Sequence, residues 1–210
     1  SGSGLTSVEL PASVKTVGEG AFARCENLES ATVGSENIGK DAFYADAALA
    51  ALTLNKEVKT IGDGAFKSCS ALTGINIEGT ALESIGDEAF AYTSISALDL
   101  SAQKSLKTVG GWALAKTPIS TATLPNSVSS VGEGTFFYAA QLETANMPDS
   151  LTTVPAFTFA GAEALVGESI VPATATEMGD FSFYNACAMP NFTIPKSINR
   201  IGTKAMAGMT

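Results

Sequence analysis

Pairs of apolar residues five positions apart recur along the whole chain at regular intervals. The second member of a pair is usually Phe. The pairs are Val17/Phe22, Ile38/Phe43, Ile61/Phe66, Ile85/Phe90, Val109/Leu114, Val131/Phe136, Val154/Phe159, Met178/Phe183 and Ile201/Met206. A motif that returns at a fixed period of 20 to 50 residues is typical of a solenoid, in which each repeat forms one coil and buries its apolar face against its neighbours.

The repeats have nearly constant length. An apolar residue closes each Phe segment, and these residues step along the chain by 21 to 24 positions, at 5, 28, 49, 72, 95, 119, 142, 165 and 189. The pattern therefore predicts one solenoid of about nine 23-residue repeats over residues 5–210. The opening residues 1–4, Ser-Gly-Ser-Gly, are interpreted as a cloning remnant or a trimmed linker.

The residue pattern predicts two extended segments in each repeat. Alternation in Ser7-Val8-Glu9-Leu10 indicates a half-buried strand with Val8 and Leu10 inward, and Pro11 ends it because Pro lacks an amide donor. Corresponding inward pairs include Leu52/Leu54 and Phe192/Ile194. A second extended piece is expected to carry Val14 and Val17 inward. Gly follows it in eight of nine repeats, and Pro155 replaces it in the seventh. Either close backbone approach explains this Gly better than a positive φ, or the seventh repeat turns differently.

The segment around each Phe is predicted to be a short helix with the Phe pointing inward. Acidic residues precede several of these segments, as expected for the first turn of a helix, where a carboxylate meets unsatisfied amides. They are Glu19, Asp63, Asp87, Glu133 and Asp180. A calcium site is the alternative. Other residue types intervene in the repeats between them, so no dense cluster of oxygen ligands follows.

Composition narrows the function classes. The 210 residues carry a net charge of -9 with a pI near 4.5, which argues against binding to nucleic acid or to an anionic membrane surface. No apolar run is long enough to span a membrane. The chain lacks His, the commonest general base and metal ligand. The thiols of Cys25, Cys69 and Cys187 are expected to be free and to serve as small core residues. No catalytic, cofactor-binding or metal-binding set is predicted.

The repeat resembles a known family. The motif Leu-x-x-Val-x-Leu-Pro-x-Ser-Val-x-x-Val-Gly-x-Gly-Ala-Phe-x-x-Cys-x-x-Leu, from Leu5 to Leu28, is similar to the BspA-like (Treponema-type) leucine-rich repeat, and the similarity extends over essentially the whole chain. The resemblance implies a secreted or cell-surface bacterial protein that adheres to host matrix proteins or to other cells. The fold class expected is an α/β repeat: a right-handed leucine-rich-repeat solenoid with parallel strands on one side and short helices on the other. Trp112 with Leu114, and Pro155, depart from the motif, and distorted coils are expected there.

Two surfaces are candidates for partner binding. On the strand side, the outward residues are small and polar, and they include Thr53, Asn76, Asp99, Thr123 and Asn146. On the side of the Phe segments, aromatic residues follow or lie near the anchor, and they include Tyr92, Phe137, Tyr138 and Tyr184. For the strand side, the alternative is a solvated ladder stabilised by cross-strand pairs. For the aromatic residues, it is packing between adjacent coils.

Function is predicted on this basis to be non-enzymatic. The first hypothesis is a surface module for adhesion that binds a protein or glycoprotein, such as a host extracellular matrix protein. The alternative is a structural spacer within a larger surface protein. The chain is expected to be a monomer that can make end-to-end contacts, without nucleic-acid partners and without insertion into a membrane.

Overall fold

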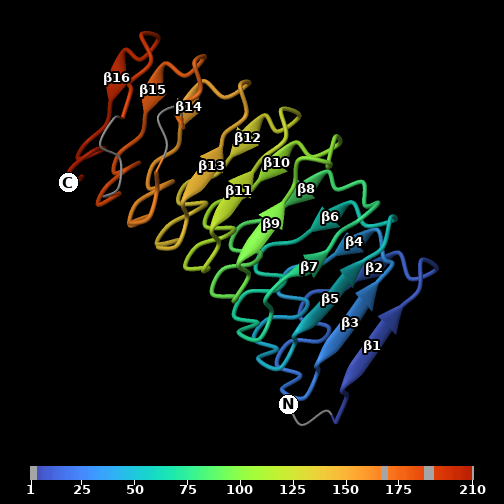
Figure 1. The fold of residues 1–210 in the computed structure, drawn as a ribbon. Coiled ribbons are helices and arrows are strands. Elements are labelled where there is room, and N and C mark those ends of the chain that lie inside the picture. Colours follow the sequence, from blue (N-terminus) through green and yellow to red (C-terminus); the bar gives the residue numbers. More distant parts are fainter. Residues whose placement is uncertain (1–3, 167–169, 187–191, 210) are drawn as a thin grey trace.

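The chain forms a solenoid of parallel strands stacked along one axis. The computed structural model describes residues 4–166, 170–186 and 192–209. Strands return to the same two sides of the solenoid in coil after coil, and the chain ends lie at opposite ends of the stack (Figure 1). The prediction of a parallel-stranded solenoid is confirmed. The predicted start of the last repeat at residue 189 and the thiol of Cys187 lie outside the described residues.

The first ladder holds the longer strands and consists of two sheets. One contains β1 (Ser7–Leu10), β3 (Ser30–Val33), β5 (Ala51–Leu54) and β7 (Ile75–Asn76), and the other contains β9 (Ala97–Asp99), β11 (Thr121–Thr123) and β13 (Thr144–Asn146). All pairs are parallel and in register, so that Ala31 lies between Val8 and Leu52. Because side chains alternate across a strand, this register lines up one apolar row inward and one polar row outward.

The second ladder consists of two-residue strands that carry the first member of each apolar pair. One sheet contains β2 (Thr16–Val17), β4 (Asn37–Ile38), β6 (Thr60–Ile61), β8 (Ser84–Ile85), β10 (Thr108–Val109) and β12 (Ser130–Val131), and another contains β14 (Thr153–Val154), β15 (Glu177–Met178) and β16 (Arg200–Ile201). From β2 to β16 the chain completes about eight turns.

The Phe segments form turns, and the prediction of short helices there is wrong. No helix occurs in the part of the chain that the structure describes. Instead, amides of one coil donate to carbonyls of the next: Phe43 N–H bonds Ala65 O at 2.8 Å, and Phe90 N–H bonds Ala113 O at 2.9 Å. In an α-helix, these amides and carbonyls would instead bond to each other within the same segment. The turns therefore make a third hydrogen-bonded side, which we call the turn face.

Backbone geometry explains why no helix forms. In every coil, the residues two positions before and two positions after the Phe anchor have positive φ. Before the anchor they are Gly20, Asp41, Gly64, Glu88, Trp112, Gly134, Phe157, Phe181 and Lys204, here called the upstream left-handed row. After it they are Arg24, Ala45, Ser68, Tyr92, Lys116, Tyr138, Gly161, Asn185 and Gly208, the downstream left-handed row. A left-handed residue cannot continue a right-handed helix.

Replacing a strained residue in these rows by Gly is expected to stabilise the protein. Ser68 has a φ of 63° and a half-buried side chain, and Gly already occupies the same place at Gly161. Ser68→Gly should relieve about 1–2 kcal/mol of backbone strain, but Gly also adds conformational entropy to the unfolded chain. We therefore expect the free energy of unfolding, measured in a urea melt, to rise by about 0.5–1 kcal/mol. Ala71→Gly, without positive φ, is the control and should lower stability. A destabilised Ser68→Gly protein would contradict the assignment of strain.

Close packing explains the Gly that follows the short strands of the second ladder, as predicted, except at Gly18 in the first coil, where a Cβ would meet nothing within 4 Å. A Cβ at Gly62 would lie 2.8 Å from the carbonyl carbon of Gly39, and one at Gly179 would lie 2.6 Å from the amide nitrogen of Ala156. The three Asp residues among the acidic residues that follow have a different role from the predicted one, because the Oδ1 atoms of Asp63, Asp87 and Asp180 each accept a backbone N–H of the next coil. Asp63 Oδ1 accepts the Asp87 N–H at 2.9 Å. This carboxylate therefore ties its coil to the next coil, because there is no helix end to cap.

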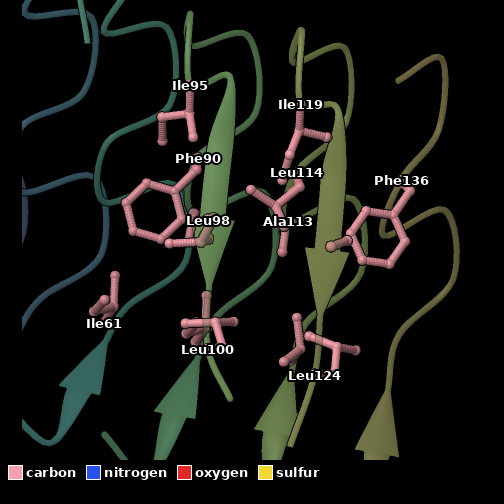
Figure 2. Packing of buried hydrophobic residues seen from close by; sticks show 14 of the residues in the cluster. Ile61, Phe90, Ile95, Leu98, Leu100, Ala113, Leu114, Ile119, Leu124 and Phe136 are labelled. Atoms are coloured by element: carbon pink, nitrogen blue, oxygen red, sulfur yellow. The ribbon is translucent and has the colours of Figure 1, made fainter. Parts of the chain in front are cut away.

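The core is a column of stacked rings. Phe22, Phe43, Phe66 and Phe90 stack with centroids 5.0, 5.1 and 5.5 Å apart. Leu114 interrupts the column between Phe90 and Phe136, and aliphatic residues of both ladders surround it (Figure 2). Stacking resumes from Phe136 to Phe159 at 5.7 Å.

Some residues predicted to point inward lie near the surface. Val14 is 38% exposed and Ile194 is 39% exposed. Val14 lies in the first coil, and Ile194 follows shortly after residues 187–191. At these two places the inward assignment is wrong, whereas the inward residues of β5 and β9, Leu52, Leu54 and Leu98, are buried.

Candidate functional site

Outward residues of the first ladder lie where the sequence places them, but in two separate groups. Thr53 pairs with Asn76 across β5 and β7, and Thr123 lies between Asp99 and Asn146 across β9, β11 and β13. Asn76, Asp99 and Asn146 are exposed, and the two Thr residues are half-buried. No strand pairing connects β7 to β9 in the described part of the ladder, so Asn76 and Asp99 face each other across a break.

Side-chain hydrogen bonds end the strands at this break. Asn76 Oδ1 accepts the Glu78 N–H at 3.1 Å, and Asp99 Oδ1 accepts the Ser101 N–H at 2.8 Å. Such bonds two residues ahead turn the backbone away from an extended course. Hydrogen bonds from the Ser101 side chain and amide also lower the pKa of Asp99, so its carboxylate is ionised at neutral pH.

Gln103 fastens the two sides of the break together. Its side chain is buried, and its Oε1 accepts from Thr80 Oγ1 at 3.0 Å and from the Leu82 N–H at 3.3 Å. Its Nε2 donates to the Ile77 carbonyl at 3.4 Å. One carboxamide thus replaces the missing strand pairing with side-chain bonds to the preceding coil.

Removing this carboxamide should destabilise the solenoid. We expect Gln103→Leu to lower the free energy of unfolding by about 1–3 kcal/mol, because the buried Leu82 N–H loses its partner and the Ile77 carbonyl keeps only its bonds from Thr80. Chemical denaturation measures this, with the exposed Gln141→Leu as control, expected within about 0.5 kcal/mol of the parent. A Gln103→Leu protein as stable as the control would show that these contacts contribute nothing.

Shallow hollows flank the break on the strand side. One of about 670 Å³ is lined by Thr53, Asn76, Lys56, Glu57 and Glu78, among others. A second, of about 340 Å³, contains Asn76, Glu78, Asp99 and Gln103. Asn146 lines a third of about 250 Å³. The first ladder therefore offers small polar recesses that can exchange hydrogen bonds with a partner, but no aromatic anchor.

The aromatic candidates lie on the turn face, and three of the four are brought together. Phe137, Tyr138 and Tyr184 belong to one contiguous group with Trp112, Phe157 and Phe181; we call these six residues the turn-face cluster. Tyr92 lies outside it, with Lys116 Nζ 5.1 Å from its ring centroid. Tyr138 is 47% exposed, and the other five are half-buried.

Ring contacts make the cluster continuous across four coils. Trp112 meets Phe137 edge-on at 4.8 Å and Phe157 at 5.9 Å, and Phe157 stacks on Phe181 at 5.0 Å with an interplanar angle of 3°. Phe137 also contacts Tyr138 at 4.6 Å, and Phe181 contacts Tyr184 at 5.6 Å. Packing between adjacent coils, the alternative considered for these side chains, thus occurs together with partial exposure.

The backbone of the turns places these rings on the surface. Trp112, Phe157 and Phe181 occupy the upstream left-handed row, and positive φ turns their side chains away from the core column. Gly134 and Gly161 provide the space, since a Cβ at Gly134 would strike the Trp112 ring and one at Gly161 would lie 3.0 Å from the Tyr138 ring. Sequence reasoning did not single out Phe157 and Phe181. The signal that could have found them is aromatic residues recurring two positions before the anchor.

A buried carboxyl group lies inside the turns of the second coil. Asp46 is fully buried three positions after Phe43, and its Oδ1 accepts the Cys25 N–H at 2.7 Å. Among the described residues, Oδ2 has no hydrogen-bond partner. Burial raises the pKa of Asp46 from 3.8 to about 7, against the opposing effect of the Cys25 and Arg24 amides. This group is enclosed by the core and is not accessible to a substrate.

The thiols near Asp46 are free. Cys69 is buried and Cys25 half-buried, and burial raises the pKa of Cys69 to about 12. Cys69 Sγ donates to the Phe43 carbonyl at 3.1 Å. Within residues 4–166, 170–186 and 192–209, no three His, Cys, Asp or Glu side chains are grouped to hold a metal ion. Over the same residues, no helix is long and apolar enough to cross a membrane.

Comparison with known proteins agrees with the geometry. A model of the BspA type leucine rich repeat region matches six copies over residues 1–113 and 83–210. Among curated protein sequences, none matches the chain significantly. Similar solved structures include a leucine-rich repeat protein from Bacteroides ovatus (22% identity, TM-score 0.71, 97% of this chain and 49% of that one). Others are the Treponema pallidum leucine-rich repeat protein TpLRR (22%, 0.54, 97% and 76%) and the pneumococcal vaccine antigen PcpA (20%, 0.58, 97% and 60%).

These likenesses are below 25% identity and establish the fold. The chain spans about half the length of the Bacteroides ovatus protein. The family match covers all of the present chain, and it agrees with the parallel ladders and the recurring Phe turns. The chain belongs to the BspA-type leucine-rich repeat family.

Proposed function

We propose that this solenoid is a non-enzymatic protein-interaction module that acts in adhesion at a bacterial surface, with a host matrix protein or glycoprotein as partner. The turn-face cluster is the observation that carries the proposal. Six aromatic rings lie together at the surface, one of them 47% exposed. Tyr and Trp are the residues most enriched in the energetic centres of protein interfaces, because they bury a large rigid area at low entropic cost.

The surface location is supported by the family and by one similar structure. The similar structure is that of PcpA, a pneumococcal vaccine antigen. Family membership adds the general role of repeat solenoids, which present extended surfaces to partners.

Within this proposal the two candidate surfaces have different roles. Phe137, Tyr138 and Tyr184 make the primary contact on the turn face. Polar residues of the first ladder form a secondary surface that can add hydrogen bonds: Thr53, Asn76, Asp99, Thr123 and Asn146. We rank them in this order because hydrogen bonds to exposed polar groups replace hydrogen bonds to water and add little net affinity.

A binding screen tests the proposal. Immobilised fibronectin, fibrinogen, collagen and laminin and a glycan array are probed with this chain at physiological salt. We expect saturable binding that Tyr138→Asn weakens at least fivefold, while Thr123→Arg, on the strand side, changes it less. Asn is chosen because Tyr138 has a φ of 51°, which Asn tolerates well. Binding abolished by Thr123→Arg and unaffected by Tyr138→Asn would reverse the ranking of the two faces.

A spacer is the second candidate function, and the backbone pairing between successive coils favours it. Strand and turn hydrogen bonds join successive coils on several sides of the solenoid, which makes a stiff rod. Because the chain spans about half of the Bacteroides ovatus protein, such a rod can separate other parts of a longer chain. A folded protein that binds nothing in the screen would move the assignment to this role.

A further inference from the structure

On the turn face, two lysine side chains of this chain lie over aromatic rings. Lys116 Nζ lies 5.1 Å from the Tyr92 ring centroid, and Lys204 Nζ lies 5.9 Å from that of Phe181. Both distances are within the range in which a cation is attracted by the face of a ring. These two lysines belong to the left-handed rows at either end of the turn-face cluster, so the cluster lies between two internal examples of the same contact.

The central rings of the cluster differ from its ends. Among the described residues, no Lys or Arg is placed over Trp112, Phe137 or Tyr138. Trp is the aromatic side chain that binds cations best. The middle of the cluster therefore presents partly exposed rings, among them Tyr138 at 47%, of the type that the chain's own lysines contact at its ends.

Carboxylates border these rings. Glu133 is exposed, and its carbonyl accepts the Trp112 N–H at 2.8 Å, which fixes this residue beside the indole. Asp87 Oδ1 accepts the N–H of Gly111, the residue before Trp112, at 2.7 Å. Asp180 lies next to Phe181, and its carbonyl accepts the Phe157 N–H at 3.0 Å. The field beside the cluster thus favours positive charge, in keeping with the overall charge of -9.

We infer that the turn-face cluster binds a segment of a partner protein that carries Arg or Lys side chains, with the cations seated on the Trp112, Phe137 and Tyr138 rings and balanced by Glu133, Asp87 and Asp180. This inference rests on the proposed function and adds the face and the chemical class of the partner. An uncharged aromatic surface would suit a sugar or an apolar segment equally well. The neighbouring carboxylates, and the lysines that lie over two of the rings, distinguish the turn-face cluster from such an uncharged surface and favour a cationic partner.

Trp112 reports on the site directly, because it is the only Trp of the chain. The free protein is first titrated with caesium and with iodide, and quenching of Trp112 emission is expressed relative to N-acetyltryptophanamide. We expect relative quenching by caesium to exceed that by iodide at least twofold, and the double variant Asp87→Asn/Glu133→Gln to remove most of the difference. Equal relative quenching by both ions in the parent would overturn the inference.

A peptide titration tests recognition itself. A twelve-residue peptide of alternating Arg and Gly is compared with one of alternating Gln and Gly. Saturable change of Trp112 emission is expected with the Arg peptide alone. The affinity should fall at least fivefold in Phe157→Asn and in Tyr138→Asn and be kept in Phe157→Tyr, which retains a ring. Circular dichroism verifies that each variant is folded, and Tyr138→Asn, at an exposed side chain, remains informative if Phe157→Asn unfolds.

Nonspecific attraction to an acidic protein is controlled by a charge-matched variant. Glu29→Gln/Glu57→Gln removes two carboxylates outside the cluster and should leave peptide affinity within twofold. The inference would be overturned if the Gln peptide bound as tightly as the Arg peptide, or if a cello-oligosaccharide changed Trp112 emission in place of the Arg peptide. It would also be overturned if Glu29→Gln/Glu57→Gln lowered the affinity for the Arg peptide as much as Asp87→Asn/Glu133→Gln. Partner binding in the matrix screen without Arg-peptide binding would overturn this inference while leaving the proposed function intact.

Discussion

Replacing Phe90 by Ala should lower the free energy of unfolding by about 3–5 kcal/mol, because the residue is 1% exposed and forms the end of a column of stacked rings. Phe66 lies on one side at a centroid distance of 5.5 Å, and Leu114, a smaller side chain, lies on the other. A cavity at this place cannot be filled by a neighbouring ring. Equilibrium unfolding in urea measures the loss.

Tyr92→Ala is the matched control for this prediction. Tyr92 belongs to the same turn but is 46% exposed, and its ring contact is the cation–π interaction with Lys116. Loss of a partly exposed ring contact should cost no more than about 1 kcal/mol. If Phe90→Ala cost less than about 1 kcal/mol, or no more than Tyr92→Ala, the inward assignment of the Phe anchors would be wrong.

Replacing Asp46 by Thr should stabilise the protein at pH 8 by up to about 4 kcal/mol and have little effect at pH 4. The pKa of Asp46 is about 7 in the folded state because burial disfavours the carboxylate, against 3.8 in an exposed chain. A difference of about three pKa units, at about 1.4 kcal/mol each, gives this upper limit. Thr already occupies the same place at Thr93 and Thr117, where each hydroxyl donates to the carbonyl of the anchor residue at 2.9 and 2.8 Å.

The direction of the pH effect follows from proton binding. Between pH 3.8 and about 7, the folded state holds the Asp46 proton while the unfolded state has lost it. This group therefore makes the native protein less stable as pH rises through that window, and its contribution is constant above and below it. Asp46→Thr removes this dependence.

Urea melts of the parent and of Asp46→Thr at pH 4, 6 and 8 test the prediction. Thr117→Val, at the equivalent place three coils along, serves as a control whose effect should not vary with pH. If the advantage of Asp46→Thr were the same at all three pH values, Asp46 would titrate as an exposed carboxyl, and its burial in the folded state would be contradicted.

Periodicity predicted the repetition, the parallel ladders and the inward Phe residues, because stacked identical coils impose the same burial on the same position. It did not predict the turns. Acid-x-Ala-Phe is compatible with a first helical turn, and what excludes a helix is positive φ at residues as different as Gly20, Asp41 and Trp112. Gly and Asp adopt the left-handed region readily, but Trp at the same position does not, so tertiary pairing between coils decides the backbone.

For the candidate sites, single positions were predicted better than their grouping. Phe137, Tyr138 and Tyr184 were found from their place after the anchor. Phe157 and Phe181 were missed because a helix would have directed the position two before the anchor elsewhere. On the strand side, the break between Asn76 and Asp99 depends on side-chain bonds and on Gln103, which no periodic pattern shows. Local chemistry of this kind becomes visible only when coils are stacked.

The central claim is that a partner binds the turn face through its aromatic cluster. Hydrogen–deuterium exchange of the chain with and without the protein that scores highest in the matrix screen tests it most directly. We predict slower exchange at the turn-face amides of residues 134–138 and 156–161, with little change at the strands of residues 51–54 and 97–99. Protection confined to those strands would contradict the account.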